Sequence, residues 1–421
     1  MLSLLWICLI AVVSLKNTDN IYKLYLILIL SVPFNEKIYE KIGLSLFGIS
    51  LTNILLILLL LLSLRQIVKN KAVPFAKYDF LTIFFVILII IYMYIGYKNQ
   101  NIFLKSDIKT FMLIIITYFV FRVDIYFKNN GGGYVRIVIY SIIIYSITTI
   151  IIYIFRDKIL PLIYNDNLLL WWESSRVAFS NGCLSLLLPL IFSAKKSIVK
   201  NRIKIIAVIS SIASAIISQS RALILMYLTL LILAFIINSA RKNVIVIFSL
   251  ALSCFMIIST AIMFNGEVMS YASSSNNVIV NRFVQLLNKE YKENNVRSRT
   301  NYECLNEIRE SGYLGFGLGK EMVLYNVDSS IASTSMFIDN GIYTIMGKMG
   351  IFAIIPIVVF IITIIVSLIK SGNINNYTKL LLLSTIISFV FTTGIINAQI
   401  IYSTPISTIT IISIVLFQRK V

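Results

Sequence analysis

The sequence contains no histidine, and only 13% of its residues are charged, against about 25% in soluble domains. The lack of histidine removes the commonest transition-metal ligand and the commonest base at neutral pH. Such low charge excludes a water-soluble globule. Of the four cysteines, only Cys304 lies outside an apolar run, and the cysteine spacings match no zinc motif.

The sequence is instead rich in long apolar runs, and 58% of its residues are hydrophobic. The runs are continuous rather than alternating in polarity, which favours membrane-spanning helices over a barrel. We therefore predict an all-α polytopic membrane protein with about 12–13 transmembrane helices. The candidate spans lie near 2–15, 21–34, 43–64, 80–97, 107–121, 134–155, 175–193, 203–218, 221–238, 243–264, 340–369, 378–396 and 399–417.

The net charge of +19 comes from basic residues in alternate connections between these spans. Such connections face the cytoplasm, and because the charges form no single basic face, nucleic acid is not expected as a partner. The connections at 35–42, 98–106, 156–174 and 265–339 have a mixed or acidic balance and are predicted outside. The inside residues are Arg65, Lys69, Lys71 and Lys77; Arg122, Lys128 and Arg136; Lys195, Lys196, Lys200, Arg202 and Lys204; Arg241 and Lys242; and Lys370 and Lys379.

One membrane domain with one large insertion is the resulting organisation. Membrane helices occupy 1–264 and 340–421, and 265–339 forms a large extracytoplasmic loop. Apolar residues at helical spacing predict two short amphipathic helices in the loop, one around Phe283, Leu286 and Leu287 and one around Tyr302, Leu305 and Ile308. Gly312–Gly319 is predicted to be a flexible turn segment rather than a phosphate loop, since no strand precedes it and no Gly-Lys-Ser/Thr follows.

Two arginines, Arg176 and Arg221, lie at the outer ends of predicted spans. Each could extend toward lipid headgroups, or the two could bind an anion such as a diphosphate, which the arginine fork suits. Arg297 and Arg299 add positive charge in the loop, either as solvated surface or as part of a site. Asn181, five residues after Arg176, could satisfy a neighbouring backbone group or bind a ligand.

A base must be a carboxylate in a chain without histidine. Asp339 is the leading candidate because it lies where the loop re-enters the membrane, and partial desolvation there would favour a base. The outer segments contain no D-x-D or comparable acidic cluster, so neither a metal nor another cofactor is predicted.

Four motifs lie over roughly 170–355: R-V-A-F-S-N-G, S-Q-S-R-A-L, R-S-R-T leading to G-F-G-L-G, and D-N-G-I-Y-T-I-M-G-K-M-G-I. Together they resemble the motifs of the bacterial O-antigen and capsular polysaccharide polymerases in the O-antigen polymerase/ligase superfamily. R-V-A-F-S-N-G from Arg176 resembles the family's Arg-x-x-Gly-x-Phe-x-Asn stretch, and S-Q-S-R-A-L around Arg221 resembles its Ser-Arg-Gly/Ala element. R-S-R-T to G-F-G-L-G resembles the Arg-to-Gly-x-Gly pattern of the loop. D-N-G-I-Y-T-I-M-G-K-M-G-I, from Asp339, resembles the re-entry segment.

The resemblance implies a metal-independent, inverting glycosyltransferase of the bacterial cytoplasmic membrane whose substrate is an oligosaccharide linked to undecaprenyl diphosphate. It implies that a growing glycan is transferred onto an incoming lipid-linked repeat unit, and that a chain-length regulator and a flippase of the same pathway are partners beside the lipid bilayer. Arg176 and Arg221 would hold the diphosphate and Asp339 would act as the base. The substrate-binding residues it suggests are Arg297, Arg299, Asn181, Asn340 and Tyr343.

Departures from the family pattern decide between the alternatives. Ala178 stands where the family usually has glycine, and Asp339 stands where the ligase branch has its histidine base, which favours a polymerase over an O-antigen ligase. A flippase for the same lipid-linked oligosaccharide is the other alternative. It would need charges deep in many spans and short loops on both sides, whereas these spans carry few charges and one loop is long.

Overall fold

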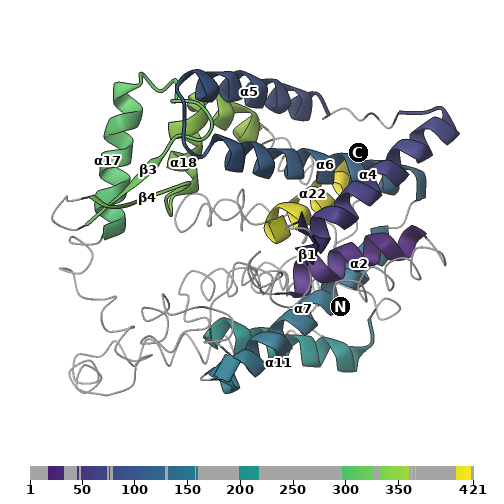
Figure 1. The fold of residues 1–421 in the computed structure, drawn as a ribbon. Helices are drawn as coiled ribbons and strands as arrows, with labels where there is room; N and C mark the ends of the chain where they lie inside the picture. The colour runs from purple at the N-terminus through teal and green to yellow at the C-terminus, as the bar shows by residue number, and fades with distance from the viewer. Residues whose placement is uncertain are drawn as a thin grey trace, which may run out of the picture.

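The computed structural model describes residues 18–32, 45–46, 49–73, 75, 79–128, 131–156, 158–159, 199–217, 296–326, 331–359, 362, 366 and 404–418. Helices predominate in this part of the chain (Figure 1). The elements are α2 (Thr18–Ser31), β1 (Ser45–Leu46), β2 (Ile49–Ser50), α4 (Leu51–Asn70), α5 (Asp79–Lys98), α6 (Leu104–Lys128), α7 (Gly131–Ile154), α11 (Asn201–Ile217), α17 (Val296–Glu310), β3 (Met322–Tyr325), β4 (Ile331–Ser335), α18 (Gly341–Met349), η3 (Ile351–Ala353) and α22 (Thr404–Gln418).

Four of these helices, α4 to α7, are long and apolar enough to cross a membrane, and a bent pair near the end of the loop could make a fifth. The prediction of a mostly helical, multi-pass membrane protein is thereby confirmed. The shorter α2, α11 and α22 fall on the predicted spans 21–34, 203–218 and 399–417. The predicted spans 2–15, 175–193, 221–238, 243–264 and 378–396 lie outside the described residues.

The predicted span 43–64 is wrong at both ends. Residues Ser45–Leu46 pair with Ile49–Ser50 as a short antiparallel ladder, so α4 begins only at Leu51. The Ser50 hydroxyl caps the helix by accepting a hydrogen bond from the Asn53 amide. The leucine run passes into good helix formers, and the helix therefore continues to Asn70 and carries Arg65 and Lys69 on its last turns rather than in a loop.

Helix α6 likewise extends past its predicted end, to Lys128, and this corrects the assignment of Arg122 to a loop. The Arg122 side chain is buried, with its Nε 3.5 Å from Asp79 Oδ2 at the start of α5. The Tyr118 hydroxyl donates to the same carboxylate. The two buried charges offset each other, and the Tyr118 hydroxyl stabilises the carboxylate further.

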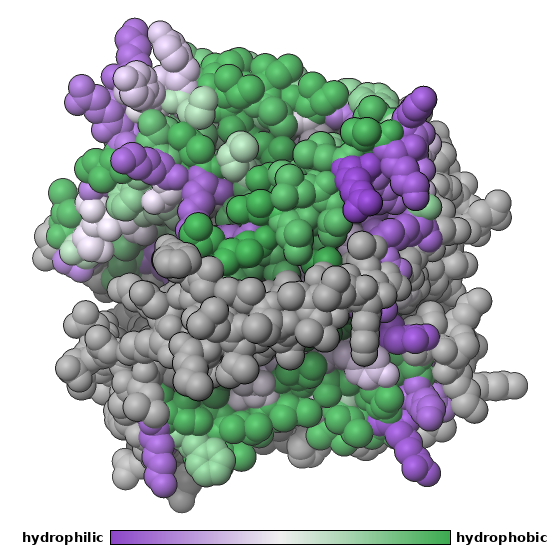
Figure 2. Space-filling model, turned by 45° about the vertical axis from the view of Figure 1, so that its right-hand side comes forward, coloured by the Kyte–Doolittle hydropathy of each residue, from purple (hydrophilic) through white to green (hydrophobic). Residues whose placement is uncertain are grey.

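The core of the bundle lies between α2, α4, α6, α7 and α22, whose buried side chains form one apolar cluster. Phe121 on α6 is central to it and makes edge contacts with Tyr22 and Tyr134. Outward-facing side chains of α5 are apolar as well, among them Phe80, Ile83 and Ile87. Figure 2 shows such side chains as broad green areas on the surface, as expected for helices in contact with lipid.

The predicted span 340–369 is interrupted. Helix α18 ends at Met349, and the helix of Ile351–Val359 is turned from it by 120°. Gly350 makes the turn with a φ of 65°, in the left-handed region that favours glycine. The chain that re-enters the bundle is therefore two helices at an angle rather than one straight span.

Candidate functional site

Helix α17 provides one wall of the candidate site. Its predicted amphipathic character is confirmed, with a buried stripe of Thr300, Cys304 and Ile308 at intervals of four residues. Tyr302, expected on the apolar face, is exposed instead. The first predicted amphipathic helix, around Phe283, lies outside the described residues.

A two-stranded antiparallel sheet of β3 and β4, which was not predicted, lies beside α17. Met322 at the start of β3 is buried with Cys304, Ile308 and Ile338, and this small cluster joins the sheet and α17 to the start of α18. The Tyr325 amide also donates to the Thr300 hydroxyl at 3.1 Å. The sheet thus fixes α17 against α18 and the residues that precede it.

Asp339, the predicted base, lies directly before α18 and pairs with Arg297 on the first turn of α17. The distance from Arg297 Nε to Asp339 Oδ2 is 2.5 Å, and the two side chains are 59% and 43% exposed. Asp339 is of intermediate burial beside α17, and its carboxylate remains in contact with water. What the fold provides is an accessible carboxylate held by a guanidinium.

Asn340 and Tyr343, two of the predicted substrate-binding residues, belong to the start of α18. The Asn340 side chain caps this helix, since its Oδ1 accepts from the amides of Ile342 and Tyr343 at 3.1 and 3.2 Å. The Tyr343 side chain packs against the small cluster of Cys304, Ile308, Met322 and Ile338. Both residues therefore shape the surroundings of Asp339 through the local fold.

Arg299 is two residues from Arg297 on α17 and has a different partner. Its Nη2 lies 2.6 Å from Glu303 Oε1, one helical turn away, and its guanidinium lies over the Tyr302 ring at 5.6 Å. The structure thus gathers Arg297, Asp339 and Asn340 and places Arg299 on the neighbouring surface of α17. Arg176, Arg221 and Asn181 lie outside the described residues.

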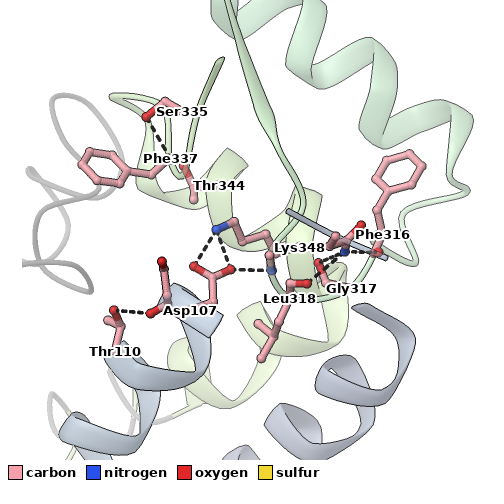
Figure 3. Close-up of polar contacts among 12 residues, drawn as sticks. Asp107, Thr110, Phe316, Gly317, Leu318, Ser335, Phe337, Thr344 and Lys348 are labelled. Atoms are coloured by element: carbon pink, nitrogen blue, oxygen red, sulfur yellow. Dashed lines mark hydrogen bonds and ion pairs between the residues drawn. The ribbon is translucent and has the colours of Figure 1, made fainter. Parts of the chain in front are cut away.

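The most buried ionic contact in the described part of the chain was not foreseen. Lys348 on α18 donates to both carboxylate oxygens of Asp107 on α6, at 2.8 and 2.6 Å, and the two side chains are 1% and 0% exposed (Figure 3). Asp107 also accepts a hydrogen bond from the Gly319 amide at 2.6 Å. The lone lysine in I-M-G-K-M-G-I was a signal, but its partner could not be read from the sequence.

The glycine-rich segment, Gly312–Gly319, runs from α17 toward β3 and is not the flexible turn that was predicted. Its Phe316 and Gly317 amides donate to the carbonyls of Gly347 and Lys348, both at 2.9 Å. The Asn101 amide group donates to the carbonyls of Phe316, Gly317 and Leu318, at 2.9 to 3.2 Å. The segment is therefore held between α18 and the connection of α5 with α6.

Glycine is required here by close backbone approach. A Cβ on Gly317 would lie 2.4 Å from the Gly96 nitrogen, and one on Gly319 would lie 2.2 Å from the Leu104 nitrogen. The contact joins the connection at 98–106 to the large loop, two segments that the distribution of basic residues predicts on the same side of the membrane.

Burial raises the pKa of the Cys304 thiol to about 12, and the charge of Glu307 adds to the effect. The thiol is therefore neutral at physiological pH and unsuited to nucleophilic chemistry. Burial and the nearby Glu307 also raise the pKa of Tyr325. Among the described residues, no three histidine, cysteine or acidic side chains come together as metal ligands would.

No family model, curated protein or solved structure matches the chain.

Proposed function

We propose that this membrane protein joins oligosaccharide repeat units, each linked to a lipid diphosphate, into a surface polysaccharide on the outer face of the bacterial cytoplasmic membrane. The observation that carries the proposal is the Arg297–Asp339 pair, in which an accessible carboxylate and a guanidinium lie 2.5 Å apart just before α18. A polymerase of this kind needs a base for a sugar hydroxyl and cations for a diphosphate. Asp339 of the pair supplies the base, and Arg176 and Arg221 are the predicted cations.

In the proposed reaction, Asp339 accepts the proton of an acceptor hydroxyl on the incoming repeat unit. The hydroxyl oxygen forms a bond to the anomeric carbon of the growing glycan, and the bond from that carbon to the lipid diphosphate breaks with its electron pair leaving on the diphosphate. Arg297 orients the carboxylate. Arg176 and Arg221, the predicted diphosphate ligands, would stabilise the charge on the leaving group, and this single displacement would invert the anomeric centre.

Transport of the same substrate is supported less well. A flippase would need charged side chains along a path through the membrane. In the described helices, Asp79 and Asp107 lie in the first turns of α5 and α6 and Arg122 near the end of α6, and each has an ion-pair partner. These charges fix helix ends to one another. A ligase, which would pass the finished glycan to a different lipid acceptor, is the other alternative. Analysis of the products distinguishes a ligase from a polymerase.

The test is the length of the glycan made by cells that carry variant proteins. Asp339→Asn keeps the shape of the side chain and removes its basicity, so we expect polymer to fall by about 100-fold or more while single lipid-linked repeat units are still made. Arg176→Ala and Arg221→Ala should have the same outcome. Glu310→Gln, at an exposed carboxylate at the end of α17, is the matched control and should leave chain length unchanged.

Glycan gels measure the chain length, and detection of the lipid-linked repeat unit shows whether single units are still made. Wild-type chain lengths in Asp339→Asn would remove this residue as the base. Wild-type chain lengths in both arginine variants would remove the diphosphate contacts.

A further inference from the structure

We infer that the chain enters the bilayer at Ile351 rather than at residue 340, so that α18 lies on the outer membrane surface together with α17, β3, β4 and the glycine-rich segment. These elements are called the surface unit below. The exposed aromatic residues where it meets α5 would then contact lipid headgroups. The inference concerns the membrane boundary and does not depend on the proposed function.

The break at Gly350 is built into the fold. Gly347 and Lys348, near the end of α18, have their carbonyls satisfied by the amides of the glycine-rich segment, and the Ile351 amide donates to the Tyr313 carbonyl at 3.0 Å. A Cβ on Gly350 would lie 2.4 Å from the Leu314 carbonyl oxygen. A break with its backbone groups paired in this way is a stable feature, and it separates α18 from the helix that follows.

An ion pair places the end of α18 at one end of the α5–α6 hairpin. Lys348 pairs with Asp107 in the first turn of α6, at the end of the α5–α6 hairpin where the two helices are connected. Ile345 and Met349 of α18 pack in one cluster with Leu88 of α5, and Ile354 and Ile357 beyond the break pack against the same cluster. In Figure 1, α18 stands at the end of the α5–α6 hairpin, close to α17.

Span length agrees with this placement. A straight helix over 340–369 would be about 45 Å long, well beyond a hydrocarbon core of about 30 Å. From Ile351 to residue 369 the sequence is apolar for about 19 residues and is followed by Lys370. That length and its basic end are typical of a complete span.

The elements that meet at the junction between the surface unit and the bundle carry exposed aromatic and apolar side chains. Tyr94 and Tyr97, near the end of α5, are 67% and 73% exposed, and Tyr313 and Leu314 of the glycine-rich segment and Phe352 after the break are exposed as well. Tyrosine is enriched at membrane interfaces because its ring is apolar and its hydroxyl remains in contact with water. The partner that fits these exposed side chains is the headgroup layer of a bilayer.

The test is the reactivity of single cysteines, introduced after Cys8, Cys183, Cys254 and Cys304 are replaced by alanine. Ile342→Cys reports on α18 and Ile355→Cys on the helix after the break, and both positions are exposed in the protein. Ile102→Cys, between α5 and α6, and Val68→Cys, near the end of α4, are the references for the two sides of the membrane. A membrane-impermeant maleimide is added to sealed spheroplasts, and labelling after denaturation verifies that each thiol is intact.

We expect Ile342→Cys to react within about threefold of Ile102→Cys, and Ile355→Cys at least tenfold more slowly, because a maleimide reacts with thiolates in water and not in hydrocarbon. Val68→Cys should require permeabilised membranes. Protection of Ile342→Cys at the level of Ile355→Cys would overturn the inference. So would equal reactivity of Ile355→Cys and Ile102→Cys. Loss of glycan polymerisation is not part of this readout, so the topology and the proposed function can fail separately.

Discussion

At the scale of single residues, the Asp107–Lys348 pair is the contact on which the surface unit depends most directly. It joins α6 to α18 across 241 positions of sequence and leaves almost no surface of either side chain exposed. Removing one partner would leave a buried, unpaired charge, which costs about 3–5 kcal/mol. Replacing both by apolar residues would avoid that cost.

We therefore expect Lys348→Met and Asp107→Asn each to lower the thermal unfolding temperature in detergent by several degrees. The double variant Asp107→Leu/Lys348→Met should recover part of the loss. Recovery would be incomplete because the Gly319 amide also loses its acceptor, at a cost of about 1–3 kcal/mol.

Lys105→Met, at an exposed position on the same helix, is the control and should unfold as the wild type does. A Lys348→Met protein as stable as the control would show that the pair contributes nothing to the fold.

The sequence allowed part of the candidate site to be predicted at this scale. Asp339 was identified from its place at the membrane boundary predicted from the sequence, and Arg297 from its charge. Their contact was not predicted, because the sequence does not show which elements of a long loop fold against each other. Lys348 was missed for a related reason. Its neighbours are apolar, and nothing local indicates that Asp107 lies within reach.

At the scale of elements, the glycine-rich segment decides how the loop is attached to the membrane helices. Its hydrogen bonds are made by its own backbone groups, and no side chain could be added at the points of closest approach. A comparison of two glycines of the segment distinguishes the effect of backbone strain from the effect of close packing. Gly312 and Gly319 have φ values of 62° and 78°, but nothing lies within 4 Å of a Cβ on Gly312.

Alanine at either glycine should cost about 1 kcal/mol for its left-handed backbone. Gly319→Ala should lose far more, because its Cβ would lie 2.2 Å from the Leu104 nitrogen and separate the segment from α6. The measurement is the yield and unfolding temperature of the two purified variants. Equal losses would mean that the close approach at Gly319 is not needed.

Element prediction succeeded where composition changes sharply. Helix α5 was expected over 80–97 and is observed over Asp79–Lys98, since polar residues flank a continuous apolar run. The prediction failed where a helix continues beyond the end of its apolar run, as α4 and α6 do through turns that carry charged residues. The bend at Gly350 was hidden because apolar residues continue on both sides of it.

At the scale of the whole molecule, composition was enough to predict a helical membrane protein, and the distribution of basic residues was enough to predict that the α5–α6 connection and the large loop lie on one side. Helix packing could not be predicted. In a membrane both the buried and the lipid-facing sides of a helix are apolar, so hydrophobic periodicity does not reveal which helices are neighbours. The pairings of Asp79 with Arg122 and of Asp107 with Lys348 supply that information only once the fold is known.

The proposed function needs a direct test on the purified protein. The wild type, Asp339→Asn and the control Glu310→Gln would be placed in liposomes with the lipid-diphosphate-linked repeat unit, with a metal chelator present throughout. Lipid-linked products are separated by length, and the released lipid diphosphate is counted against the linkages formed.

For the wild type we expect a ladder of longer lipid-linked glycans, one lipid diphosphate released for each new linkage and an inverted anomeric centre. We also expect a loss of about 100-fold or more in Asp339→Asn and none in Glu310→Gln. A folded wild-type protein that leaves the repeat unit uncoupled, or only moves it between the leaflets, would contradict the proposal that this chain is a polymerase.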